Sequence, residues 1–263
     1  MLKKLVKYDL KNIFKVLVVF YALSFFFALL TIAFFAIDNS FIMNIIAKIC
    51  SGVTISMIFN ILINNMMRCW PRFSRNLYGD ESYLSHTLPV KKSTHYYSKA
   101  LASVITLAAS TVVIVATLFV AYYSKTNWEI LKNFLSVISK AIDENMFMII
   151  TAIVAILFLE IANGIQCGFT GIIFGHRMNS NKTAFSILYG FIVYMLSQVI
   201  VVLILLIVGL MDEKVMNLFV TAENVPIEMV KKLVLIAALS YSAIIIAGLF
   251  INVKLLKKGV NVD

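Results

Sequence analysis

Charged residues are scarce in this chain of 263 residues. Asp, Glu, Lys and Arg make up 14% of it, hydrophobic residues make up 61%, and the mean hydropathy is +0.94. A soluble domain carries about 25% charged and about 45–50% apolar residues. The chain also has only 3 prolines and 10 glycines, which excludes a collagen-like or breaker-rich disordered protein. The composition therefore excludes an ordinary soluble enzyme and predicts a polytopic membrane protein.

Cysteine is also scarce, and its spacing is uninformative for ligand chemistry. Cys50, Cys69 and Cys167 form no CxxC pair and lie in or beside apolar runs, so the sequence indicates neither a disulfide framework nor a zinc site. The N-terminal Met1-Leu2-Lys3-Lys4 leads into a long apolar run without a small-residue cleavage site. We therefore expect the first hydrophobic segment to be retained.

Motifs of catalysis and nucleotide binding are missing as well. The sequence contains no GxxxxGK[ST], GxSxG or HExxH pattern, which are the signatures of phosphate cradles, nucleophile elbows and zinc peptidases. We expect no catalytic residue, no metal site and no cofactor in this chain, so any ATP hydrolysis would come from another subunit.

Six apolar runs are long enough to cross a bilayer, which takes about 20 helical residues for about 30 Å of hydrocarbon. None alternates polar and apolar residues as a barrel strand would, so each is expected to be a helix. The predicted fold is an all-α membrane protein with a single transmembrane domain over residues 1–263. The runs cover residues 16–37, 41–67, 99–123, 146–175, 183–210 and 233–252.

Basic residues are distributed unequally between the two sides of the predicted membrane topology. If the N-terminus is cytoplasmic, sixteen Lys and Arg residues lie on the inner side and six on the outer side, together with eight acidic residues outside. Lys and Arg accumulate in cytoplasmic loops, so both termini are predicted to be cytoplasmic. The net charge of +10 then reflects orientation and attraction to anionic lipids rather than binding to nucleic acid.

Two segments have the pattern of surface helices. Residues 1–15 place apolar residues at helical spacing against five lysines, which predicts an interfacial elbow helix before the first crossing. Residues 124–145 repeat the pattern on the outer side, around Trp128 and Leu131, and predict an extracellular amphipathic segment.

The longest polar connection, residues 68–98, is predicted to be a cytoplasmic loop. Within it, Asp80 and Glu81 favour a helix start, because carboxylates stabilise a first turn, and Leu88-Pro89 favours a stop. Such a short helix with an apolar tip could dock a partner, or it could simply cover the helix bundle. The spacing leaves both interpretations open.

At these residues the sequence resembles a known family. The stretch from Leu77 to Lys92, followed by Ser98-Lys99-Ala100, is similar to the intracellular coupling segment of ABC-2 type transporter permeases, in particular those of bacteriocin and lantibiotic immunity systems. Weaker similarity continues over residues 168–177 and 257–263.

The resemblance implies a plasma-membrane permease subunit that pairs with a second, identical or homologous permease and docks two ATPase subunits, which bind ATP and Mg. It further implies export of amphipathic or antimicrobial peptides or of hydrophobic compounds. The residues implied in docking are Tyr78, Gly79, Asp80, Glu81, Ser82, Tyr83, Leu84, Thr87, Leu88, Pro89 and Val90.

Polar residues recur every fourth position in the second run. Because polar groups are costly toward lipid, this ridge could line a transport path, form a seam between subunits, or make hydrogen bonds between helices of one subunit. Lys48 is near enough to the outer end to extend to the interface. The ridge consists of Asn44, Lys48, Gly52, Ser56, Asn60 and Asn64.

Glu160 is the single carboxylate within a predicted span, and an ionisable residue at that depth is a functional candidate by default. It could be a gate contact, a point that attracts a basic peptide, or a structural partner of Lys48, Asn60 or Gln166. In the same run Gly164, Gly168, Gly171 and Gly175 predict a face for close helix packing.

Two other classes of function remain open from the sequence. One is a sensor or scaffold that binds a soluble partner without transport. The other is an ion-coupled secondary carrier with Glu160 as the proton site, although carriers usually show internal repeats and broken helices, and neither is clear here.

Overall fold

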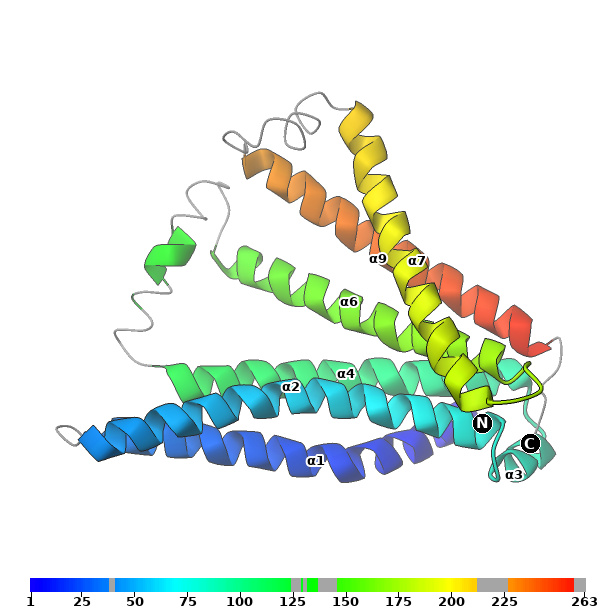
Figure 1. Cartoon of the computed structure of the whole chain (residues 1–263), viewed down its shortest axis with the longest axis horizontal. Coiled ribbons are helices and arrows are strands. Elements are labelled where there is room, and N and C mark those ends of the chain that lie inside the picture. Colours follow the sequence, from blue (N-terminus) through cyan, green and yellow to red (C-terminus); the bar gives the residue numbers. More distant parts are fainter. Residues whose placement is uncertain (38–40, 124–128, 130–131, 137–145, 212–226, 258–263) are drawn as a thin grey trace. The chain divides into compact units, whose positions relative to one another are not determined.

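The computed structural model describes residues 1–37, 41–123, 129, 132–136, 146–211 and 227–257. Regular structure in these residues is helical (Figure 1). The predicted amphipathic segment 124–145 lies outside the described residues except for 129 and 132–136. The helices are α1 (Leu2–Phe35), α2 (Phe41–Leu77), α3 (Ser82–Thr87), α4 (Lys92–Tyr122), α6 (Met146–Gly175), α7 (Lys182–Met211) and α9 (Ile227–Lys257).

Six of these helices, all except α3, are long and apolar enough to cross a membrane. The prediction of an all-α protein with six such helices is confirmed for the described residues. Each candidate span has 27 to 37 residues, whereas about 20 suffice for the hydrocarbon core. The helices therefore continue beyond their apolar runs.

Most of the predicted loop 68–98 is helical, and its cytoplasmic position stays a prediction. Helix α2 continues to Leu77, with Pro71 inside it, and α4 begins at Lys92. A proline within a helix costs about 3 kcal/mol, but the continuing turns bury Phe73, whose ring meets that of Tyr96 edge-on at 6.1 Å. Packing of these extended ends explains why they stay helical. Only residues 78–91 connect the two helices, with α3 between them.

The N-terminal segment also differs from its prediction. Residues 1–15 do not form a separate elbow helix, because α1 is continuous from Leu2 to Phe35. Asp9, Ile13 and Leu17 are buried on the face that continues through Ser24, Ala28 and Thr31. A single buried face along the whole helix accounts for the absence of a break.

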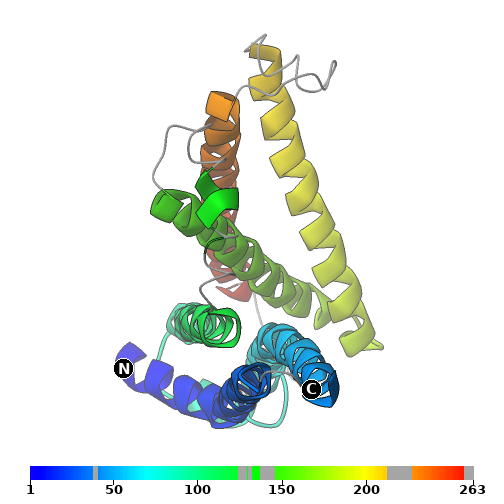
Figure 2. The ribbon, with the colours of Figure 1, turned by 90° about the vertical axis from the view of Figure 1, so that its left-hand side faces the viewer.

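The chain divides into two compact units. The first, residues 1–75 and 88–131, contains α1, α4 and α2 up to Arg75, with α1 packed along α4 (Figures 1 and 2). Hydroxyl groups join its three helices at 2.8 to 3.4 Å. These contacts are Tyr21 with Ser110, Ser24 with Thr117, Thr31 with Thr54, and Ser51 with Tyr122.

The second unit, residues 76–87 and 132–263, contains α3, α6, α7 and α9. Helix α6 packs against both α7 and α9. Figure 2 shows α7 diverging from α6 away from the short connection that joins them. The prediction of a single transmembrane domain over residues 1–263 stays a prediction.

Candidate functional site

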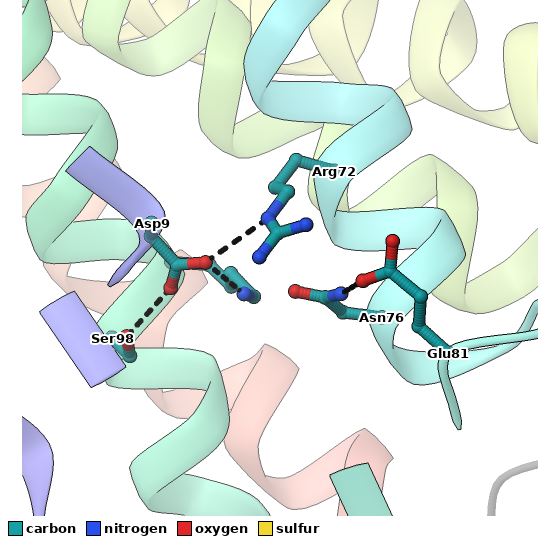
Figure 3. Close-up of polar contacts among 6 residues, drawn as sticks. Asp9, Arg72, Asn76, Glu81 and Ser98 are labelled. Atoms are coloured by element: carbon teal, nitrogen blue, oxygen red, sulfur yellow. Dashed lines mark hydrogen bonds and ion pairs between the residues drawn. The ribbon is translucent and has the colours of Figure 1, made fainter. Parts of the chain in front are cut away.

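The segment between α2 and α4 is anchored at its base. Tyr78 is only 2% exposed, and its ring stacks on that of His176 at a centroid distance of 4.2 Å and an angle of 27°. The side-chain amide of Asn76 donates a hydrogen bond to the Glu81 carboxylate (Figure 3). The Ser82 amide donates to the Gly79 carbonyl at 2.8 Å. These contacts hold the start of α3 in the second unit.

The tip of the same segment is exposed and apolar. Tyr83 is 66% exposed, Leu84 74% and Leu88 45%. The hydroxyl of Thr87 donates to the Leu84 carbonyl at 2.9 Å, which stabilises the end of α3. Among the other residues predicted for docking, Ser82 is buried, Gly79 and Val90 are half-buried, and Asp80, Glu81, Thr87 and Pro89 are exposed.

The base contacts reach the ends of two long helices. Nδ1 of His176 lies 2.9 Å from the Ile172 carbonyl of α6, and Arg177 donates to the Leu255 carbonyl of α9 at 3.0 Å. Burial raises the pKa of Tyr78 above its usual range, and the positive charge of Arg177 opposes this in part. Tyr78 therefore stays a neutral phenol at physiological pH, suited to stacking.

A second polar cluster, which the sequence did not reveal, lies in the first unit. Asp9 of α1 is 2% exposed. Its carboxylate accepts hydrogen bonds from Arg72 Nε at 3.2 Å and from Ser98 Oγ at 2.8 Å (Figure 3). It also forms an ion pair with Lys99. Asp9 thus joins α1 to the ends of α2 and α4. The sequence offers little to identify this cluster, because Asp9 stands out only as the one acidic residue in the lysine-rich segment 1–15.

The polar ridge of α2 makes hydrogen bonds to its own helix. Ser56 donates to the Gly52 carbonyl, Asn60 to the Ser56 carbonyl and Asn64 to the Asn60 carbonyl, at 2.9 to 3.0 Å. Ser56 is exposed, and Asn60 and Asn64 are half-buried. None of these bonds reaches another helix.

Asn65, the neighbour of the ridge, makes the contacts between helices instead. It is fully buried, donates to Ser110 at 2.9 Å and accepts from Thr106 at 3.3 Å, both in α4. One residue step rotates a helix by about 100°, so adjacent asparagines point to different surroundings. The pattern of a polar residue at every fourth position therefore identified Ser56, Asn60 and Asn64 on the outward face of α2. It missed Asn65, which faces α4.

Glu160 lies at the centre of a polar network in the second unit. Its Oε1 accepts hydrogen bonds from the Tyr194 hydroxyl at 2.6 Å and from Gln198 Nε2 at 2.8 Å, both in α7. The hydroxyl of Tyr241 in α9 donates to Gln198 Oε1 at 2.9 Å. The expected partner Gln166 is not among these contacts. Glu160 makes no ion pair with any residue that the structure describes.

The glycines of α6 permit its close approach to α7. A Cβ atom at Gly171 would lie 2.4 Å from the Gly190 backbone, and one at Gly175 would lie 2.4 Å from the Ser186 nitrogen. Gly168 lies near Gly190, and Gly164 is half-buried one turn before it. Gln166 is buried beside Gly248 of α9, so it belongs to the packing of this unit.

Comparisons of the chain with protein-family models, with curated proteins and with solved structures found no match.

Proposed function

We propose that the chain is the membrane-spanning permease subunit of an ATP-driven ABC exporter, and that α3 docks the ATPase. The observation that carries this proposal is the contrast between the base and the tip of the segment 78–90. Tyr78 is buried against His176, whereas Tyr83 and Leu84 are exposed outside the long apolar helices. An exposed apolar tip on a fixed base is suited to fill a pocket of another protein.

The base contacts supply a route for mechanical coupling. A push on α3 reaches α6 through the Tyr78 and His176 rings, and reaches α9 through Arg177 and the Leu255 carbonyl. ATP-driven closure of two ATPase subunits would then change the relative energies of two arrangements of the helices. ATP and Mg would be bound by those subunits.

The orientation in this proposal follows from the distribution of basic residues. With both termini and α3 cytoplasmic in the plasma membrane, the lysine-rich start of α1 faces anionic lipid headgroups. Lys3, Lys4, Lys7 and Lys11 are exposed, on the side of the helix away from Asp9.

The transport path would form between this chain and a second permease. The outward side chains of Ser56, Asn60 and Asn64 bond to their own helix and would be costly toward lipid. A path or a subunit seam would provide them with water or protein. The cargo, amphipathic or antimicrobial peptides or hydrophobic compounds, rests on the resemblance of residues 77–92 to the permease family.

The test is affinity purification from native membranes in mild detergent, with the mass of each stoichiometric companion determined. We expect an ATP-binding chain at one copy per permease with the wild type, and its loss with Leu84→Arg. The matched control is Asn179→Arg, which adds the same charge at an exposed position between α6 and α7. A companion without a phosphate-binding loop would instead indicate a scaffold.

The Glu160 network favours one rival function, an ion-coupled carrier. An intramembrane carboxylate with no ion pair among the described residues could exchange protons. In that case transport would survive ATP depletion, collapse with the proton gradient and disappear in Glu160→Gln. Transport that depends on ATP alone would exclude the carrier.

A further inference from the structure

The Glu160 network lies near the middle of its helix. Glu160 is 14 residues after Met146 and 15 before Gly175 in α6, which is about 21 Å and about 22 Å along the axis at 1.5 Å per residue. All three helices of the network, α6, α7 and α9, are candidate membrane spans. The carboxylate is therefore far from either end of the bundle.

Every hydrogen bond of the network points toward Glu160. Tyr241 donates to Gln198, and Gln198 and Tyr194 donate to the carboxylate. All of these donors are neutral groups. They bring no positive charge, and Glu160 has no ion pair among the described residues.

An uncompensated carboxylate at this depth is costly, and such residues in membrane proteins usually pair with a cation or face a water-filled cavity. Glu160, Tyr194 and Gln198 are half-buried, so the network is accessible from outside the chain. Phenol rings beside a carboxylate suit an organic cation in particular, because ring faces attract positive charge. Leu157, three residues before Glu160 and on the same side of α6, is exposed and apolar.

We propose that Glu160, Tyr194, Gln198 and Tyr241 form a binding site for the positively charged group of an amphipathic or lipophilic organic cation. This inference rests on the proposed export function and specifies the cargo as cationic. The carboxylate would neutralise the charge, and the exposed apolar side chain of Leu157 would contact the hydrocarbon part.

The test uses the purified full chain in detergent and two probes of similar size and opposite charge, tetraphenylphosphonium and tetraphenylborate, in equilibrium dialysis. We expect the cation to bind the wild type and the anion not to bind. Glu160→Gln keeps an oxygen that can accept from Tyr194 and Gln198, so the fold is retained, yet cation affinity should fall at least tenfold. Glu129→Gln, the same change at an exposed residue, should leave affinity unchanged.

Equal binding of the cation by wild type and Glu160→Gln would overturn the site, and so would equal binding of both probes or of neither. The assay contains no ATPase, so it is independent of docking. If the cation fails to bind while an ATP-binding chain still co-purifies, only the present inference fails. If the cation binds but no ATP-binding chain co-purifies, the cation site is supported and the proposed export function is contradicted.

Discussion

Asp9 shows how much one buried charge can determine in a mostly apolar chain. It contacts Arg72, Ser98 and Lys99, residues that are 63 to 90 positions away in the sequence. No periodicity connects such residues, because ion pairs between helices depend on the final packing. The hydrophobic positions of α1 could be predicted, but the acid among them could not be assigned a partner.

Replacing Asp9 by Asn should destabilise the first unit by about 3 kcal/mol, since removing one member of a buried ion pair leaves its cations without this shared counterion. Thermal unfolding in detergent measures the loss, with Glu129→Gln at an exposed position as the control. Equal melting temperatures for the two variants would show that the Asp9 cluster contributes little.

Gly171 gives a second prediction at the scale of a residue. An added Cβ would meet backbone atoms of Gly190 at 2.4 Å, so Gly171→Ala should cost about 1–3 kcal/mol by forcing α6 and α7 apart. Gly52→Ala is the matched control, because nothing lies within 4 Å of its Cβ position. The Gly52→Ala substitution should be neutral or should stabilise the protein by up to about 1 kcal/mol. The opposite order of melting temperatures would contradict the packing of α6 on α7.

At the scale of elements, the existence of the helices could be predicted but their ends could not. Runs of about 20 apolar residues are set by the thickness of the bilayer, and each corresponds to a helix. Beyond the runs, the same helices continue on amphipathic packing, as at Phe73 in α2 and Tyr96 in α4. Helix α2 continues through Pro71 because these tertiary contacts hold its last turns. Helix α3 ends at Thr87, just before Leu88-Pro89, but it begins at Ser82, so Asp80 and Glu81 precede its first turn.

The contact between Tyr78 and His176 should control the order of α3. His176→Ala removes a stacked ring pair worth about 1 kcal/mol beyond its buried area, so amide exchange across residues 76–87 should become about fivefold faster. His176→Phe keeps a ring at this position, so its exchange rate should lie between those of the wild type and His176→Ala. Hydrogen exchange with mass spectrometry measures this, and unchanged rates in His176→Ala would show that α3 is held by other contacts.

At the scale of the whole molecule, the proposed orientation is inferred from the distribution of charge and not from helix packing. Sixteen basic residues lie on the side assigned to the cytoplasm and six on the other. Alkaline phosphatase fused to either terminus should therefore be inactive, whereas a fluorescent protein there should fold. Phosphatase inserted between α7 and α9 should be active. An active phosphatase at either terminus would contradict the assigned orientation and place α3 on the wrong side for an ATPase.

Docking of an ATPase by α3 is the central claim, and crosslinking from position 84 tests it most directly. A photoreactive amino acid in place of Leu84, which is 74% exposed, would be activated in intact cells, with the same residue at Asn179 as the control. We predict an adduct at position 84, absent at position 179, whose second component is a chain with a phosphate-binding loop. An adduct lacking such a chain, or equal yields at both positions, would contradict the account.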